Sequence, residues 1–131
     1  MAYLGSLDHI DIVVENPRKM ADFFVSIGFK LVRNLEHGGD AVELAFPGDG
    51  DQPILELTSR DQGNGKVREL GLRHIAVRSS DISKTFEELT ARGYTFDKPP
   101  RPIEATGRML TNLKDPEGRS LQIVDSPASL T

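Results

Sequence analysis

The chain has 131 residues, no cysteine and a formal net charge of −4 at neutral pH. This length suits one compact domain or two small halves, and the charge gives no particular attraction to nucleic acid or anionic lipid. No apolar run approaches the ~20 residues of a membrane span, and the first ten residues lack a signal-peptide pattern, so we expect a cytoplasmic protein. Without cysteine, any metal would have to be held by histidine, carboxylate or amide oxygen.

The first strand and helix are predicted from a β-branched run followed by a capping sequence. Residues 7–14 predict a largely buried strand. Asn16 is suited to the N-cap of a helix that has Pro17 at its first position, and Gly28 is suited to end it. Helical spacing predicts one apolar face, formed by Met20, Phe23, Phe24 and Ile27.

Three further strands complete the first half of the chain. Residues 29–36 and 41–46 predict two strands around the turn 37–40, and residues 54–59 predict another strand after the loop 47–53. The first half therefore has the order β-α-β-β-β. The polar, glycine-containing stretch 60–71 is predicted to be a linker.

The second half repeats this order. Residues 72–79 predict a strand, Asp81 an N-cap and Gly93 the end of the helix, whose apolar face is formed by Ile82, Phe86 and Leu89. Strands are predicted at 94–97, 108–113 and 120–125. The stretch 98–102 must be extended or turning because it contains prolines.

The two halves align at an offset of 65 residues, which places His9 on His74 and Gly28 on Gly93. We therefore predict an α+β fold of two tandem βαβββ modules, at about 5–59 and about 72–126, in a single domain spanning residues 1–131. Pseudo-symmetric modules of this kind can enclose a cavity between curved mixed sheets with flanking helices.

Polar residues also recur in the last strand of each half, where Glu56 and Gln122 are flanked by apolar neighbours. Together with His9 and His74 they offer two imidazoles, one carboxylate and one amide oxygen, a donor set suited to a divalent metal. A histidine in a strand is also often a hydrogen-bonded core residue, and strand Glu and Gln are often solvated, so both interpretations stay open. The third histidine, His37, has no counterpart in the repeat.

Four stretches carry a resemblance to a known family: "LDHIDIVV", "ILELTS", "LRHIAVRSSDI" and "DPEGRSLQIVD". Over about residues 5–125 the chain resembles the vicinal oxygen chelate superfamily, which includes glyoxalase I, methylmalonyl-CoA epimerase, fosfomycin-resistance enzymes, extradiol dioxygenases and bleomycin-binding proteins. The resemblance implies a divalent ion (Ni, Co, Zn, Mn or Fe) held by His9, Glu56, His74 and Gln122. It also implies a small-molecule substrate and a homodimer, with no nucleic-acid or membrane partner.

Within this superfamily the donor set is most similar to that of glyoxalase I (His, Glu, His, Glu) and of methylmalonyl-CoA epimerase (His, Gln, His, Glu). The resemblance implies a lyase or isomerase that transfers a proton through a metal-stabilised enediolate or enolate of an α-oxo or thiol-linked substrate. Gln122 cannot accept a proton at neutral pH, so Glu56 is the expected catalytic base. The alternatives are a non-catalytic small-molecule binding protein of the same fold, or a dioxygenase-like member.

Glutathione is a doubtful substrate, because Arg60 stands where glyoxalase I has Asn, and Leu70 where it usually has Arg. Arginines that could hold a carboxylate or phosphate through paired hydrogen bonds are Arg60, Arg73, Arg101 and Arg108. Of these we take Arg60 and Arg108 as the substrate-binding candidates, although surface arginines are usually only solvated.

Overall fold

The computed structural model describes residues 3–36, 39–104 and 106–125. Residues 37 and 38 of the predicted turn, including His37, lie outside the described residues. The chain divides into two compact units: a first unit of His9–Arg73, and a second unit of His74–Thr131 together with Met1–Asp8.

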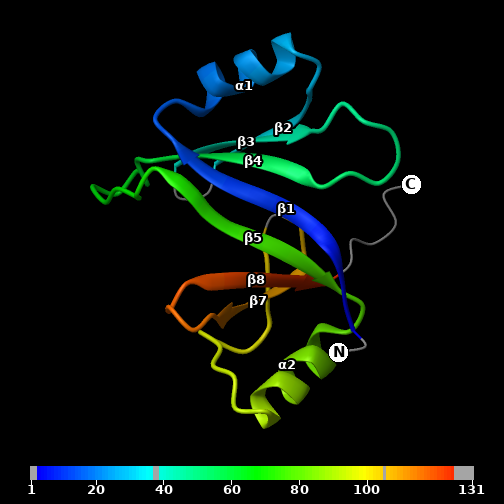
Figure 1. Cartoon of the computed structure of the whole chain (residues 1–131). Coiled ribbons are helices and arrows are strands. Elements are labelled where there is room, and N and C mark those ends of the chain that lie inside the picture. Colours follow the sequence, from blue (N-terminus) through cyan, green and yellow to red (C-terminus); the bar gives the residue numbers. More distant parts are fainter. Residues whose placement is uncertain (1–2, 37–38, 105, 126–131) are drawn as a thin grey trace. The chain divides into compact units, whose positions relative to one another are not determined.

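The first unit contains four strands and one helix (Figure 1). They are β1 (Leu4–Val14, from His9 onward), α1 (Pro17–Ser26), β2 (Lys30–Glu36), β3 (Asp40–Ala45) and β4 (Ile54–Ser59). The strand order is β2-β3-β4-β1. The strands β1 and β4 run parallel, whereas β2 and β3, and β3 and β4, are antiparallel. The first and last strands of the unit are therefore neighbours.

The second unit repeats this arrangement. It contains β5 (Gly71–Ser79, from His74 onward), α2 (Ile82–Ala91), β6 (Arg101–Pro102), β7 (Met109–Lys114) and β8 (Ser120–Asp125). The strand order is β5-β8-β7-β6, with β5 and β8 parallel and the other pairs antiparallel. The predicted α+β class and the two βαβββ modules are confirmed.

Both helices begin at the predicted caps. The Asn16 side chain accepts a hydrogen bond of 3.0 Å from the backbone N–H of Lys19, and Asp81 accepts one of 3.1 Å from that of Lys84. Each cap satisfies one of the N–H groups that the first helical turn leaves without a partner. Pro17, which has no N–H to satisfy, occupies the first position of α1.

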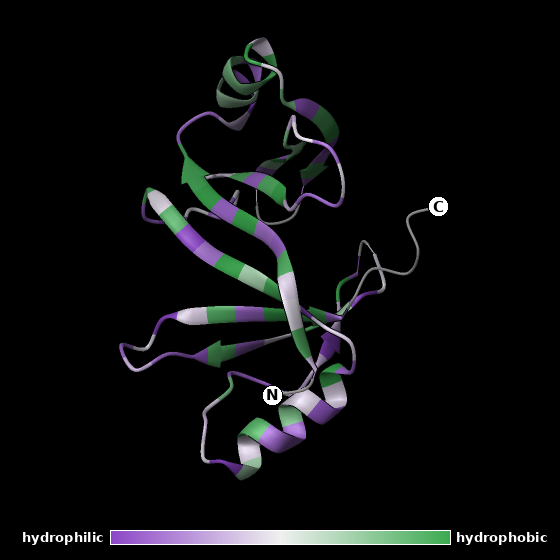
Figure 2. Ribbon diagram, turned by 45° about the vertical axis from the view of Figure 1, so that its right-hand side comes forward, coloured by the Kyte–Doolittle hydropathy of each residue, from purple (hydrophilic) through white to green (hydrophobic). Residues whose placement is uncertain are grey.

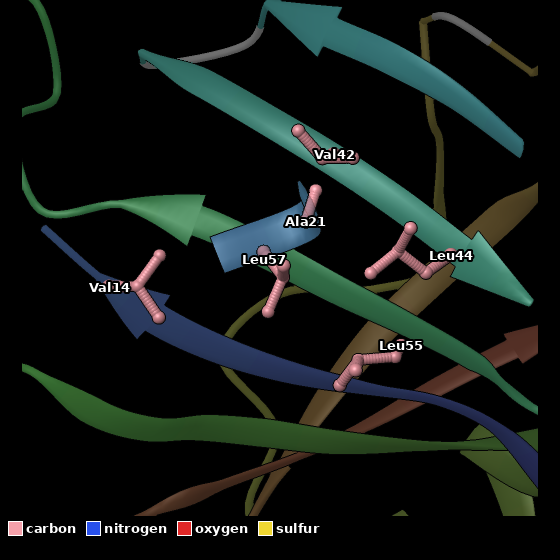
Figure 3. Close-up of a cluster of buried hydrophobic side chains, with 6 residues drawn as sticks. All are labelled: Val14, Ala21, Val42, Leu44, Leu55 and Leu57. Carbon is pink, nitrogen blue, oxygen red and sulfur yellow. The ribbon is translucent and has the colours of Figure 1, made fainter. Parts of the chain in front are cut away.

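The buried face of α1 differs from the prediction. Pro17 and Ala21 are buried and Phe24 packs against the core, whereas Phe23 and Ile27 are more than half exposed and Met20 is also exposed. The helix packs on β3 and β4 through this narrower stripe. Figure 3 shows the small Ala21 side chain beside a buried cluster formed by Val14, Val42, Leu44, Leu55 and Leu57. Figure 2 shows that hydrophilic and hydrophobic residues alternate in the middle of β1 and that the strand ends in a hydrophobic stretch.

In the second unit, the apolar face of α2 agrees with the prediction. Ile82 and Leu89 are buried together with Ile123 of β8, and Phe86 stacks edge-on against Phe96 at 4.8 Å between ring centroids. The predicted strand at 94–97 is wrong, because Phe96 makes only an isolated bridge to Leu113. The Asp97 carboxylate accepts the N–H of Lys98 and of Asn112, and two prolines without N–H groups follow, so a regular ladder cannot continue there.

The stretch predicted as a linker folds back on itself. Its backbone pairs Arg68 N–H with Arg60 O at 2.8 Å and Gln62 N–H with Lys66 O at 3.0 Å, with a bridge between Asp61 and Val67. We call residues Arg60–Arg68 the arm. Among the described residues, no helix has the length and apolar character needed to cross a membrane.

Candidate functional site in the first unit

The parallel pairing of β1 and β4 gathers polar side chains on one face of the first unit. The register aligns Asp11 with Glu56 and Val13 with Thr58, and His9 stands two residues before Asp11 on the same strand. Because side chains alternate along a strand, His9, Asp11, Glu56 and Thr58 project from the same face of the sheet. The parallel pairing of β1 and β4 is thus what brings His9 and Glu56 together.

His9 and Glu56 form a shielded pair. The Nε2 atom of His9 lies 4.0 Å from Oε2 of Glu56, and their side chains are 13% and 9% exposed. Two atoms bound to one ion at about 2.0–2.2 Å each can be no more than about 4.4 Å apart. The observed separation satisfies this limit, and imidazole with carboxylate is a donor pair suited to a divalent transition metal. These two residues fit a shared metal ion.

Asp11 is a buried member of this face that the sequence analysis missed. It is 1% exposed and accepts a hydrogen bond of 2.7 Å from Thr58 Oγ1 and one of 3.1 Å from Arg73 Nη1. Burial, and then the negative charge of Glu56, raise the pKa of Asp11, while Thr58, Arg73 and His9 partly offset that rise. Its position two residues after His9 in a strand was the signal that could have identified it.

His74 and Gln122 belong to the second unit, where they stand in a related register. Gln122 of β8 aligns with Ala76 of β5, and His74 stands two residues before Ala76, just as His9 stands two residues before Asp11. Ala76 therefore replaces Asp11 at the equivalent position. Within the part of the chain that the structure describes, no three His, Asp or Glu side chains gather closely enough to hold one ion. The four-residue ligand set stays a prediction.

The two arginines expected to bind substrate both have carboxylate partners. Arg60 donates from Nη1 to Glu15 Oε1 at 3.1 Å, and both side chains are largely exposed. Arg108 donates from Nη2 to Asp8 Oδ1 and to the backbone oxygen of Asp125, each at 2.8 Å. Asp8 is 4% exposed and also accepts a hydrogen bond from Arg78. The substrate-binding roles of Arg60 and Arg108 stay predictions.

Comparison with known proteins places this geometry in context. The family model described as "Glyoxalase/Bleomycin resistance protein/Dioxygenase superfamily" matches residues 6–123. A lactoylglutathione lyase of Arabidopsis thaliana is 25% identical over 120 residues, which cover 88% of this chain and 42% of that protein. Glyoxalase I of Saccharomyces cerevisiae is 26% identical over 140 residues, covering 92% of this chain and 43% of that protein. The chain thus spans about two fifths of the length of these two relatives.

A solved structure shares the fold over almost the whole chain. The crystal structure of methylmalonyl-CoA epimerase from Mycobacterium tuberculosis matches with a TM-score of 0.81 at 21% identity, covering 98% of this chain and 91% of that one. At this identity the likeness shows the fold alone.

Proposed function

Because the chain belongs to the Glyoxalase/Bleomycin resistance protein/Dioxygenase superfamily, we propose that it is a metal-dependent lyase or isomerase of the glyoxalase I or epimerase type. It moves a proton at a carbon next to a carbonyl of a small α-oxo or thiol-linked substrate. The observation that carries this proposal is the shielded His9–Glu56 pair on one face of the first unit. The lyases among the relatives support the reaction class.

The residues that would hold the metal are His9 and Glu56 in the first unit and His74 and Gln122 in the second. When bound, a divalent ion supplies Lewis-acid polarisation of a substrate carbonyl, which makes the neighbouring C–H more acidic. The half-buried His74 and Gln122 occupy strands β5 and β8, which are parallel neighbours like β1 and β4. The repeat thus provides an imidazole and an oxygen donor in each unit.

Glu56 is the base in this proposal. Its side chain is 9% exposed, so little water competes for the proton that it accepts. Gln122 carries an amide that cannot take a proton at neutral pH, which leaves Glu56 as the carboxylate of the four-residue set. Asp11 lies beside Glu56 in register and is held by Thr58 and Arg73. These contacts give the strand face around Glu56 a defined geometry.

Metal content tests the first half of the proposal. Untagged protein is produced with Ni, Co, Zn and Mn all available and analysed by elemental mass spectrometry. We expect about one ion per chain in the wild type and a loss of at least ten-fold in His9→Ala, because a ligand is removed. His37→Ala removes the one histidine outside the predicted set and is the matched control. Equal metal content in wild type and His9→Ala would contradict the proposal.

Hydrogen exchange at the substrate carbon tests the second half. The hemithioacetal of an α-oxo aldehyde and a 2-methyl-branched acyl thioester of coenzyme A are each incubated with the protein in D₂O and followed by NMR. Deuterium incorporation that depends on Glu56 supports the lyase or isomerase. Binding of these compounds without exchange, and without dependence on metal, would instead favour the small-molecule binding protein.

The family resemblance also leads us to propose a homodimer in the cytoplasm. Light scattering coupled to size exclusion gives the mass in solution, and twice the chain mass is expected. The monomer mass at all concentrations would contradict this.

A further inference from the structure

A cavity of about 400 Å³, wide open to solvent, lies within the first unit between the arm and the neighbouring strands. Its lining residues are Val13, Gln62, Arg68, Glu69, Leu72 and Arg73. The lining therefore combines an apolar part, Val13 and Leu72, with two guanidinium groups, one amide and one carboxylate. This volume is within the range of pockets that bind small molecules.

Both guanidinium groups are held in place by the protein at one end. Arg68 donates from Nη1 to the backbone oxygen of Ser59 at 2.9 Å, and its own N–H pairs with Arg60 in the arm. Arg73 donates from Nη1 to the buried Asp11 at 3.1 Å. In the described ranges these are the hydrogen bonds of the two guanidiniums, and each group has five N–H donors. Each guanidinium therefore keeps N–H donors that can bind an anion.

The two positive groups also act on each other. Burial lowers the pKa of Arg68, and the neighbouring charge of Arg73 lowers it further, while Asp11 and Glu56 act in the opposite direction. Two guanidiniums that share one cavity repel, and an anion placed between them would relieve that repulsion. Glu69 contributes one negative charge to the lining, which disfavours a highly charged group such as a diphosphate.

We propose that the cavity lined by Arg68 and Arg73 is a binding site for a carboxylate group of a small organic acid. The planar fork of each guanidinium matches a carboxylate with paired hydrogen bonds, Gln62 can donate one more, and Val13 and Leu72 pack against the carbon chain. The arm is the element that creates this site, because it brings Arg68 beside Arg73 of β5.

This site indicates which class of substrate the proposed enzyme would take. Arg73 bonds Asp11, which neighbours Glu56 in register, so a molecule whose carboxylate binds Arg73 can extend along the strand face that holds Glu56. The substrate class that follows, a carboxylate-bearing α-oxo or acyl compound, rests on the proposed function. The binding of a carboxylate to the cavity does not.

The test measures binding of malonate, inorganic phosphate and neutral dimethyl malonate to the full chain at constant ionic strength. Calorimetry gives the affinities, and NMR of the arginine Nε–H signals reports which guanidiniums respond. We expect malonate to bind at least as tightly as phosphate, dimethyl malonate not to bind, and Arg68→Gln and Arg73→Gln each to weaken malonate at least ten-fold. Arg119→Gln, a change of the same charge at an exposed turn, is the matched control.

Each experiment is run on protein as purified and after metal removal. Equal malonate affinity in both states supports the cavity, whereas binding only in the metal-containing state would place the anion on the ion and overturn the proposal. Tighter binding of phosphate than of malonate, or an undiminished affinity in both arginine variants, would also overturn it. If a variant fails to fold, the wild type suffices, because malonate should protect Arg68 and Arg73 from phenylglyoxal as read by mass spectrometry. Unprotected modification contradicts the proposal.

Discussion

Thr58 Oγ1 donates a hydrogen bond of 2.7 Å to Asp11 Oδ1 between the parallel strands β4 and β1, and both side chains are about 1% exposed. The bond joins residues that are 47 positions apart in sequence. A carboxyl group buried to this degree requires partners, and Thr58 is one that the strand register provides.

Thr58→Val tests how much this bond stabilises the first unit. The substitution keeps the shape but removes the donor, so we expect the free energy of unfolding to fall by about 1–3 kcal/mol. Urea denaturation followed by circular dichroism measures it. Thr90→Val, at an exposed position of α2, is the control and should change stability by no more than about 0.5 kcal/mol. An unchanged stability of Thr58→Val would show that water replaces the lost donor.

Glu56→Gln separates catalysis from folding. The amide has the same size but cannot accept a proton, so we expect turnover of an exchangeable substrate to fall by at least about 10²-fold. The far-ultraviolet circular dichroism spectrum should stay unchanged. Glu87→Gln on the exposed side of α2 makes the same chemical change elsewhere and should retain full turnover. Full activity in Glu56→Gln would remove Glu56 from its proposed role as base.

Arg108→Gln distinguishes a structural from a substrate-binding role. Its guanidinium holds the buried Asp8, so removing it leaves a buried carboxylate with fewer partners, and we expect a destabilisation on the order of 3 kcal/mol. Thermal unfolding measures the loss, with the exposed Arg119→Gln as control. A variant that unfolds like the wild type but shows a raised KM would instead support the substrate-binding prediction made from the sequence.

The stability of the second unit should depend on acid pH through Asp97. Burial raises the pKa of this carboxyl group, but hydrogen bonds from Arg101, Asn112 and the N–H of Lys98 outweigh burial and hold the pKa well below its ordinary value of 3.8. A lowered pKa in the folded state stabilises the protein at every pH above the ordinary value. That contribution is lost progressively as the pH falls below about 4 towards the folded-state pKa.

Asp97→Asn is the variant that checks this dependence. At pH 7 it should unfold more easily than the wild type, and the difference should shrink as the pH falls from about 4 to 2. Denaturant titrations at several pH values measure it. A difference that stays constant with pH would mean that the charge on Asp97 is not what stabilises the turn.

Much of the fold could be predicted because it depends on local chemistry. Asn16 and Asp81 cap the helices through bonds that span three residues, so neighbouring sequence contains all the information needed. The repeat predicted that the second half follows the element order of the first, whereas the parallel pairing of the first and last strands of each unit is seen only in the structure. The buried face of α1 was mispredicted. The spacing of apolar residues shows that the helix has an apolar side, but not which residues of that side contact the sheet. Ala21 faces the sheet because a small side chain lets the helix lie close to β3 and β4.

The sequence by itself determined the helix caps and, apart from the strand predicted at 94–97, the order of the elements, because these follow from short-range bonds and from a repeated pattern. The proximity of His9 and Glu56 depends on the register of β1 and β4. Only the tertiary structure decided which charged groups meet. Arg73 reaches Asp11 across 62 positions, and Arg108 reaches Asp8 across 100. Such pairs depend on strand order, on register and on the fold of the arm, and a one-residue shift in register would turn each side chain to the opposite face.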